Sequence, residues 1–352
     1  MSVNDLATSG QNFNARSARQ DPAWITERGE SYRRYRQIWA ERPQLLDTGN
    51  FPLHLDIETT NLCNLKCIMC PRTIYMNRGD WRWSPNGLGL MDMGLYGRLM
   101  DQAAEGGAYS VKLNLLGEPL MHPELPAQVA YAKRRNLLVM LNTNAVLLTE
   151  KLAIRLLEAG VDDVFFSLDS ADPATFERVR PGARFDQVKD NIENFIRLKN
   201  KLGHRRVRIR AAMVADVLEP TRPDETAAFQ QMMAELGVDE VGAGPMDDHT
   251  VDHSRDNVGL SGFTCEQLYQ RMFITWDGDI LPCCGHFERG YVIGSALSMD
   301  LAVAWANPKY KTLRKAHESD RFWSIPICRA CSVPYLDSLS RTQSDSLREA
   351  SA

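Results

Sequence analysis

The sequence predicts an α/β fold in which short strands alternate with helices. Between residues 52 and 246, six short apolar segments of β type alternate with five amphipathic helical segments. One unit also recurs, since residues 157–164 (LEAGVDDV) and 234–241 (AELGVDEV) share the order helix end, glycine, short loop, strand. Such alternation is typical of a parallel sheet. The pattern by itself allows an open doubly wound sheet or a curved partial barrel.

The expected strands are 54–60, 111–117, 138–145, 163–170, 207–214 and 239–246. The expected helices, recognised by apolar residues at three- and four-residue spacing, are 93–106, 123–135, 149–159, 186–202 and 223–236. Thr149 is a suitable N-cap, and Gly160 and Gly237 stand where a glycine commonly ends a helix. We also expect a helical lead-in over 24–46, packed on the barrel exterior, and one short helix over 302–317.

Composition narrows the class of protein. The chain has 352 residues, 44% hydrophobic and 24% charged, as expected of a soluble globular protein, and its net charge of -4 gives no sign of nucleic-acid binding. The first 21 residues are polar, without the apolar region of a signal peptide, and no stretch is apolar enough to cross a membrane. We therefore expect a cytoplasmic protein. The expected domains are a polar tail and lead-in (1–50), a barrel (51–247), a small second domain (248–338) and a polar tail (339–352).

The chain has eight cysteines, an even number, so disulfide bonds must be weighed against metal binding. Clustered cysteines in a long chain without an export signal more often bind metal, so disulfides are the weaker interpretation. The first cluster, Cys63, Cys67 and Cys70, follows the first expected strand, and the carboxyl ends of strands carry the sites of α/β folds. Three thiolates can hold three irons of a [4Fe–4S] cluster and leave the fourth iron open to a ligand. A zinc site with a fourth ligand from elsewhere is the alternative.

The spacing CxxxCxxC after a first strand resembles the signature of the radical S-adenosylmethionine (SAM) superfamily, over roughly residues 52–246. The resemblance implies a partial (β/α)6 TIM-like barrel, which resolves the choice left open above. It implies that SAM chelates the open iron, that an external one-electron reductant such as flavodoxin or ferredoxin supplies the electron, and that a 5′-deoxyadenosyl radical abstracts a hydrogen atom from the substrate.

Other segments resemble the family's SAM-binding motifs. Residues 116–119 (LGEP) are expected to end the second strand, where a backbone edge and a carboxylate suit the SAM ammonium. Polar side chains at the ends of the third and fourth strands suit its ribose and carboxylate, although loop capping explains them equally well. One arginine of the fifth strand could face the site or solvent. The resulting SAM-binding candidates are Gly117, Glu118, Pro119, Asn142, Asn144, Ser167, Asp169 and Arg210.

A second group of cysteines lies near the C-terminus. Cys265, Cys283, Cys328 and Cys331, together with a turn at 277–279, resemble the auxiliary-cluster module called SPASM in its shortened twitch form. Because no cysteine follows Cys331, the resemblance implies one auxiliary [4Fe–4S] cluster and two clusters in total. A structural zinc site is the alternative. Cys284 is then the cysteine that neither cluster needs.

The family resemblance favours a small-molecule substrate. Twitch-type relatives include aminocyclitol dehydrogenases and carbohydrate epimerases of antibiotic biosynthesis, so we expect oxidation of an alcohol to a ketone on a sugar-like molecule, with the auxiliary cluster as electron acceptor. The alternatives are an epimerase in which Cys284 donates the hydrogen atom, a peptide maturase, and an iron–sulfur electron carrier. Weaker candidates are the polar loop residues Asp247, Asp248, His249 and His253, and the segment 81–83 (WRW) as a cover.

Overall fold

The structure is a computed structural model that describes residues 28–215, 217, 223–245, 251–285 and 288–339. The candidates Asp247, Asp248 and His249 lie outside these residues. The described strands form one nine-stranded sheet in the order β6-β5-β4-β3-β2-β1-β7-β8-β9. The first six strands, each parallel to its neighbours, are β1 (His54–Ile57), β2 (Ser110–Lys112), β3 (Leu138–Thr143), β4 (Asp163–Ser167), β5 (Arg208–Ala215) and β6 (Glu240–Pro245).

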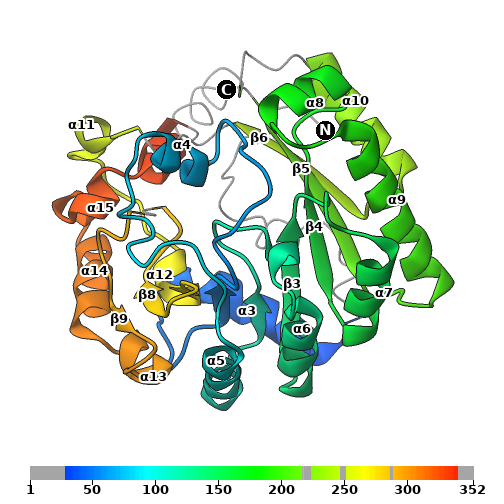
Figure 1. Cartoon of the computed structure of the whole chain (residues 1–352). Helices are drawn as coiled ribbons and strands as arrows, with labels where there is room; N and C mark the ends of the chain where they lie inside the picture. The colour runs from blue at the N-terminus through cyan, green and yellow to red at the C-terminus, as the bar shows by residue number, and fades with distance from the viewer. Residues whose placement is uncertain (1–27, 216, 218–222, 246–250, 286–287, 340–352) are drawn as a thin grey trace, which may run out of the picture.

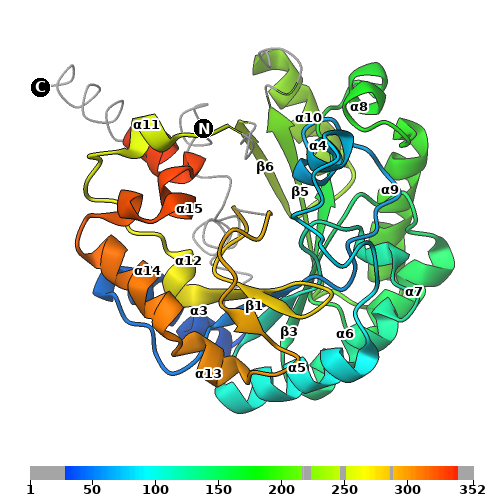
Figure 2. The same cartoon turned by 60° about the vertical axis from the view of Figure 1, so that its left-hand side comes forward.

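The consecutive strand order makes this a partial barrel. A doubly wound sheet reverses its strand order and carries helices on both faces, whereas consecutive right-handed crossovers leave every helix on one face. Figures 1 and 2 show these helices around the outside of the curved sheet. They are α5 (Met93–Gly106), α6 (Leu125–Arg134), α7 (Glu150–Ala159), α9 (Phe185–Lys201) and α10 (Pro223–Glu235). The barrel expected from the sequence is confirmed.

Local signals place the helix ends as expected. The Thr149 side chain accepts a hydrogen bond from Leu152 N at the start of α7, and Gly160 ends this helix at φ 90°. Gly237 likewise has φ 82° after α10. Within the described part of the barrel, two short helices were not expected, α4 (Pro71–Asn77) and α8 (Pro173–Val179), and both begin with a proline.

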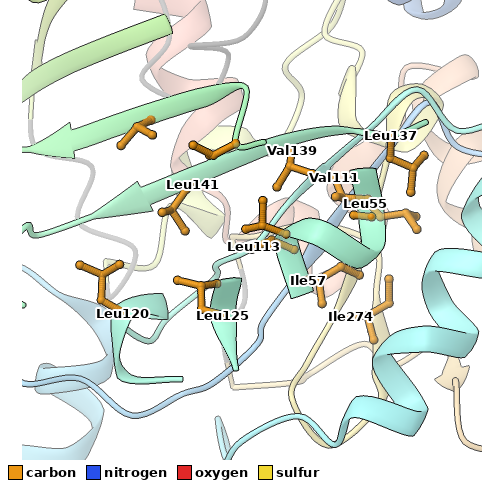
Figure 3. Packing of buried hydrophobic residues seen from close by; sticks show 14 of the residues in the cluster. Leu55, Ile57, Val111, Leu113, Leu120, Leu125, Leu137, Val139, Leu141 and Ile274 are labelled. Atoms are coloured by element: carbon orange, nitrogen blue, oxygen red, sulfur yellow. The ribbon is translucent and has the colours of Figure 1, made fainter. Parts of the chain in front are cut away.

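The main core lies between the sheet and these outer helices. Residues at alternate strand positions, such as Leu55, Ile57, Val111 and Val139, are fully buried there (Figure 3). The side chains between them face the other way, into the barrel, because successive residues of a strand point to opposite faces. The outer face therefore stabilises the fold, and the inner face is available for chemistry.

The N-terminal end of the barrel is closed by α3 (Glu30–Leu45). Tyr35 Oη and Ser110 Oγ are 2.9 Å apart, the Trp39 ring lies edge-on to His54, and Trp39 O accepts a hydrogen bond of 2.7 Å from Gln270. The lead-in helix expected from the sequence is thus present. It covers the floor of the barrel, however, and not its outer flank, because its aromatic side chains reach the inward-facing residues of β1 and β2.

The C-terminal region continues the barrel sheet. Strand β7 (Arg271–Ile274) pairs in parallel with β1 over four residues, and β8 (Asp279–Leu281) and β9 (Gly294–Ser295) extend the sheet with antiparallel pairing. None of these three strands was expected from the sequence. The helices of this region, on the left of Figure 2, are α11 (Ser254–Asn257), α12 (Gln267–Gln270), α13 (Leu301–Trp305), α14 (Pro308–Glu318) and α15 (Pro326–Arg329).

Two boundaries differ from expectation. The single helix expected over 302–317 is divided into α13 and α14, because Asn307 caps a new helix that begins at Pro308, where the ring cannot continue the preceding one. Strand β2 ends at Lys112, several residues before the LGEP segment. The backbone beyond it turns toward the cysteine loop, where Glu118 N donates a 2.7 Å hydrogen bond to Leu62 O.

Candidate functional site

Cys63, Cys67 and Cys70 lie on the loop that connects β1 to α4. Cys70 N donates a hydrogen bond to Cys67 O, and Cys70 also occupies the N-cap position of α4. Burial raises the pKa of Cys67 to about 12, and the adjacent Cys70 and Cys63 thiols add to the rise. Since iron binds the thiolate form, cluster assembly must release these protons.

Gly117 holds the LGEP segment against this loop. A Cβ atom at Gly117 would lie 2.0 Å from Thr60 O and 2.8 Å from Leu62 O, both of them backbone atoms. Only glycine allows such close backbone approach. The segment therefore braces the cysteine loop, although it lies beyond the end of β2.

The Glu118 carboxylate is directed at the end of β3. It accepts hydrogen bonds from Thr143 Oγ1 at 2.7 Å, from Asn144 N at 2.8 Å and from Leu120 N at 3.1 Å, the last of these at the start of a 3-10 turn that begins with Pro119. Asn144 Nδ2 continues the network to Asn64 Oδ1 at 3.0 Å. The structure thus joins the second and third predicted motifs to the cysteine loop. A direct contact of Glu118 with an ammonium group stays a prediction.

Asp169 follows β4 and forms a buried ion pair that the sequence did not suggest. Its carboxylate accepts a 2.6 Å hydrogen bond from Arg180 Nε, and Arg180 Nη1 lies 3.7 Å from Cys67 Sγ. Arg180 directly follows α8, the unexpected helix. The one sequence feature that could have predicted this contact is the segment 180–182 (RPG). Its proline and its glycine, the glycine at φ 100°, turn the chain back toward the cysteine loop. A guanidinium beside the thiols suits a negatively charged cluster or a carboxylate.

The remaining SAM candidates lie on the inner face at two depths. Asn142 and Ser167 are half-buried, as are the other inward-facing residues of the upper strands, Lys112, Asn114, Met140, Phe165, Ala212 and Val214. Arg210 is 2% exposed and donates to Oδ1 of Asp163, the first residue of β4, at 2.8 Å. The structure therefore does not bring Arg210 together with the other candidates.

The second group of cysteines surrounds one pocket. Cys265, Cys283, Cys328 and Cys331 all line it, within about 490 Å³ of empty space that includes its open mouth. Its wall is otherwise largely apolar, and burial raises the pKa of Cys283 and Cys328 well above the usual thiol range. One ring in the wall, His317, is neutral because burial lowers its pKa to about 4.

The spacing of the thiols favours a cluster over a single ion. Among the described residues, no group of three or more His, Cys, Asp or Glu side chains is arranged to hold one metal ion. A zinc ion requires all its ligand atoms within about 2.3 Å of one point. A [4Fe–4S] cluster takes one thiolate on each iron and so requires wider spacing. The three-thiol loop and the four-thiol pocket stay predicted cluster sites.

Cys284 lies outside the pocket. Its thiol is within 3.6 Å of Gln267 Nε2, and the side chain packs beside the buried pair Tyr75 and Trp83. Burial raises the pKa of the Cys284 thiol, while the charges of Arg271 and Lys112 oppose the rise. Because Arg271 and Lys112 are inward-facing residues of β7 and β2, Cys284 is on the inner-face side of the pocket.

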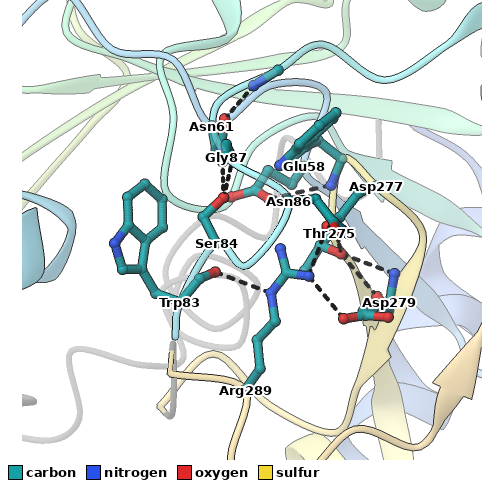
Figure 4. Close-up of polar contacts among 12 residues, drawn as sticks. Glu58, Asn61, Trp83, Ser84, Asn86, Gly87, Thr275, Asp277, Asp279 and Arg289 are labelled. Carbon is teal, nitrogen blue, oxygen red and sulfur yellow. Dashed lines mark hydrogen bonds and ion pairs between the residues drawn. The ribbon is translucent and has the colours of Figure 1, made fainter. Parts of the chain in front are cut away.

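One polar network ties the barrel mouth to the C-terminal region. Arg289 donates to Asp277 at 2.9 Å, to Asp279 at 2.8 Å and to Trp83 O at 3.0 Å (Figure 4). Asn86 adds a 2.8 Å hydrogen bond to Asp277, which lies in the turn expected at 277–279. The segment 83–87 is thus fixed between the two regions.

The two tryptophans of the segment 81–83 stack on each other. Trp83 is buried, and the exposed Trp81 lies on it at 5.9 Å between ring centroids. A role of this segment as a cover of the site stays a prediction. The weak candidate His253 lies elsewhere, stacked on Tyr335 and paired with Asp256.

Two family models match the chain over these two regions. The model described as the radical SAM superfamily matches residues 57–207, and the model described as an iron–sulfur cluster-binding domain (SPASM) matches residues 265–332. The first includes the three-thiol loop, and the second begins at Cys265 and ends one residue after Cys331. In the described part of the chain, no helix has both the length and the apolar character of a membrane span.

Individual proteins are similar over different lengths. A probable GTP 3′,8-cyclase of Methanococcus maripaludis is 33% identical over 141 residues, which are 40% of this chain and 44% of that protein. The chain thus spans less than half of that relative. Among solved structures, BtrN in complex with AdoMet and 2-DOIA has a TM-score of 0.51 at 18% identity, covering 80% of this chain and 93% of that chain. Streptococcus suis SuiB bound to the precursor peptide SuiA has a TM-score of 0.61 at 17% identity, covering 86% and 74%.

Proposed function

Because the chain is a radical SAM enzyme with a SPASM-type iron–sulfur domain, we propose that it oxidises an alcohol of a polyhydroxylated small molecule, a sugar or an aminocyclitol, to a ketone. Bound SAM and its [4Fe–4S] cluster would supply a radical that removes a hydrogen atom from the substrate carbon. The hydroxyl group would then lose its proton to a base or to solvent, and an auxiliary cluster would accept the remaining electron. Cys63, Cys67 and Cys70 would hold the first cluster, and Cys265, Cys283, Cys328 and Cys331 the second.

The observation that carries the proposal is the closed set of four thiols beside the inner face. A cluster with four protein ligands has no open iron for substrate, which leaves electron transfer as its chemistry. Cys283 lines the pocket, and the charges of the inward-facing Arg271 and Lys112 act on the adjacent Cys284, so the pocket lies close to the inner face. Of the solved structures with a similar fold, BtrN was crystallised with AdoMet and 2-DOIA, and SuiB with the precursor peptide SuiA.

The inner face has the polar groups that a hydroxylated substrate requires. Asn114, Asn142 and Ser167 are half-buried there, and amides and hydroxyls both donate to and accept from alcohol groups. At Gly244, on β6, an added Cβ would have no atom of the described residues within 4 Å.

The test is anaerobic turnover of the reconstituted enzyme with SAM, a flavodoxin or chemical reductant, and a panel of sugars and aminocyclitols. A substrate should yield 5′-deoxyadenosine together with a product two mass units lighter that forms an oxime with hydroxylamine. If only a peptide stimulates 5′-deoxyadenosine formation, the small-molecule proposal is wrong. If no SAM cleavage accompanies reduction of the clusters, the chain acts as an electron carrier.

The position of Cys284 favours epimerisation as the second candidate. An epimerase returns a hydrogen atom to the opposite face of the substrate radical, and a thiol can donate one. Cys284 lies outside the cluster pocket and on the inner-face side, as such a donor requires. Its contact with Gln267 and its packing beside Trp83 would hold the sulfur in place.

Turnover of Cys284→Ala in deuterated water distinguishes the two reactions. An epimerase would incorporate one solvent deuterium at the inverted carbon, and the variant would lose inversion while still forming 5′-deoxyadenosine. Cys284→Ser is the matched control, because it keeps the size of the side chain and removes the weak S–H bond. A ketone formed by both variants at the wild-type rate would leave dehydrogenation as the reaction.

A further inference from the structure

The floor of the inner face contains a buried carboxylate with two cations. Asp56, on β1, is fully buried and accepts two hydrogen bonds from Arg271, at 2.7 and 2.9 Å. Lys112 Nζ lies 2.7 Å from the same carboxylate. His54 Nε2 is 3.6 Å away, but burial lowers the pKa of His54 to about 4, so this ring is neutral near pH 7. The group of these four residues, called here the Asp56 cluster, therefore has two positive charges and one negative charge.

Neighbouring carboxylates do not balance the excess charge. Two other cations of the floor are paired with carboxylates of their own, in the pairs Arg208–Glu240 and Arg210–Asp163. Glu58, the next inward-facing residue of β1, accepts hydrogen bonds from two backbone N–H groups, and burial raises its pKa to about 7. Buried charge is costly unless it is paired, and among the residues that the structure describes the Asp56 cluster lacks one anion.

Lys112 is the member of the cluster that the inner face can reach. Its side chain is 18% exposed, whereas those of Asp56 and His54 are 0% and that of Arg271 is 5% exposed. Among the described residues, Asp56 is its one partner, and an ammonium group has three N–H donors. Lys112 therefore has donors for a ligand on the inner face.

We propose that the Asp56 cluster is an oxyanion subsite, in which Lys112 binds a carboxylate or phosphate group of the substrate. The inference rests on the proposed function only in taking the inner face as the substrate site, and it narrows the substrate to an anionic molecule, such as a sugar acid or a sugar phosphate. Asp56 and Arg271 are positioning residues, because they hold Lys112 without reaching the inner face themselves. Lys112 and Arg271 also act on the Cys284 thiol, so the anionic group would bind on the Cys284 side of the barrel.

Binding of inorganic phosphate to the reconstituted holoenzyme tests the subsite without turnover. At low ionic strength, phosphate should raise the melting temperature of the wild type in a saturable way. In Lys112→Gln the half-saturating phosphate concentration should rise about tenfold to a hundredfold, the effect of losing one charge-assisted hydrogen bond. Lys112→Arg should retain most of the response, and Lys311→Gln, an exposed change on α14, should behave as the wild type.

The same experiment contains the result that overturns the inference. If Lys112 serves only to neutralise Asp56, Lys112→Gln will melt lower without phosphate and will respond to phosphate as the wild type does. A wild type that shows no phosphate response also overturns it. The absolute melting temperature of Lys112→Gln should instead stay at or above that of the wild type, since the change removes the unbalanced charge.

Substrate comparison separates this inference from the proposed function. Glucose 6-phosphate and glucuronate should stimulate 5′-deoxyadenosine formation more than glucose does, and the better of the two identifies phosphate or carboxylate as the group bound. If neutral polyols are oxidised and phosphate does not bind, the proposed function stands and the subsite is wrong. If phosphate binding depends on Lys112 and no hydroxylated molecule reacts, the subsite stands and the proposed function is wrong.

Discussion

Replacing Gly117 by alanine should uncouple the cysteine loop from the barrel. The added Cβ would lie 2.0 Å from Thr60 O and 2.7 Å from Thr60 C, where about 3.2 Å or more is needed. Because the opposing atoms belong to the backbone, the loop must move by roughly 1 Å, and a side-chain rotation cannot relieve the clash. Over-packing of this kind costs about 1–3 kcal/mol. A 1 Å misplacement near the reacting groups lowers rates by roughly a hundredfold.

The assay is iron content and 5′-deoxyadenosine formation after anaerobic reconstitution. We expect Gly117→Ala to lose the iron of the three-thiol site, to keep that of the four-thiol pocket, and to cleave SAM at least about a hundredfold more slowly. Gly244→Ala is the matched control. Its Cβ meets no atom within 4 Å in the part of the chain that the structure describes, so this variant should fold and bind iron as the wild type does. Full iron content with a wild-type rate in Gly117→Ala would refute the bracing role of the LGEP segment.

Three further predictions concern the loop, its arginine and a buried acid. The wild type should bind about eight irons, and simultaneous alanine substitution of Cys63, Cys67 and Cys70 should halve the count and abolish SAM cleavage; a triple variant with eight irons would contradict the ligand assignment. Arg180→Gln should lower stability by about 3–5 kcal/mol in denaturant titrations, because it leaves the buried Asp169 carboxylate unpaired, and adding Asp169→Asn should restore part of the loss. Burial raises the pKa of Glu58 to about 7 from a usual value of 4.5, so the folded state binds its proton more tightly than the unfolded state. The stability that this proton contributes is about 3 kcal/mol; it is fully present below pH 4.5 and is lost as the pH rises through 7. Denaturant titrations across this pH range measure the loss in the wild type, and Glu58→Gln should not show it. A Glu58→Gln variant with the pH dependence of the wild type would disprove this assignment.

The strands and helices of the barrel could be predicted because their signals are local. The helix of 150–159 carries its own cap at Thr149 and its own stop at Gly160, and neither depends on the rest of the fold. The three cysteines of the first loop are similarly recognisable, since their spacing lies within eight residues of sequence. Strand β7 had no comparable signal. It is four residues long, and its partner β1 lies more than 200 residues away in the chain.

The inner face shows what sequence pattern leaves undetermined. Alternation along β5 indicates that Arg208, Arg210 and Ala212 share one face, but it does not give their depth in the barrel. Depth depends on register, and pairing of Phe165 with Arg210 puts the arginine within reach of Asp163 on the floor. The same reasoning applies to Lys112, which the sequence did not single out. The register of β1 and β2 places Lys112 opposite Asp56, so that it is the exposed member of a buried charge cluster. No local sequence pattern predicts this position, and it is the observation on which the proposal of an anionic substrate rests.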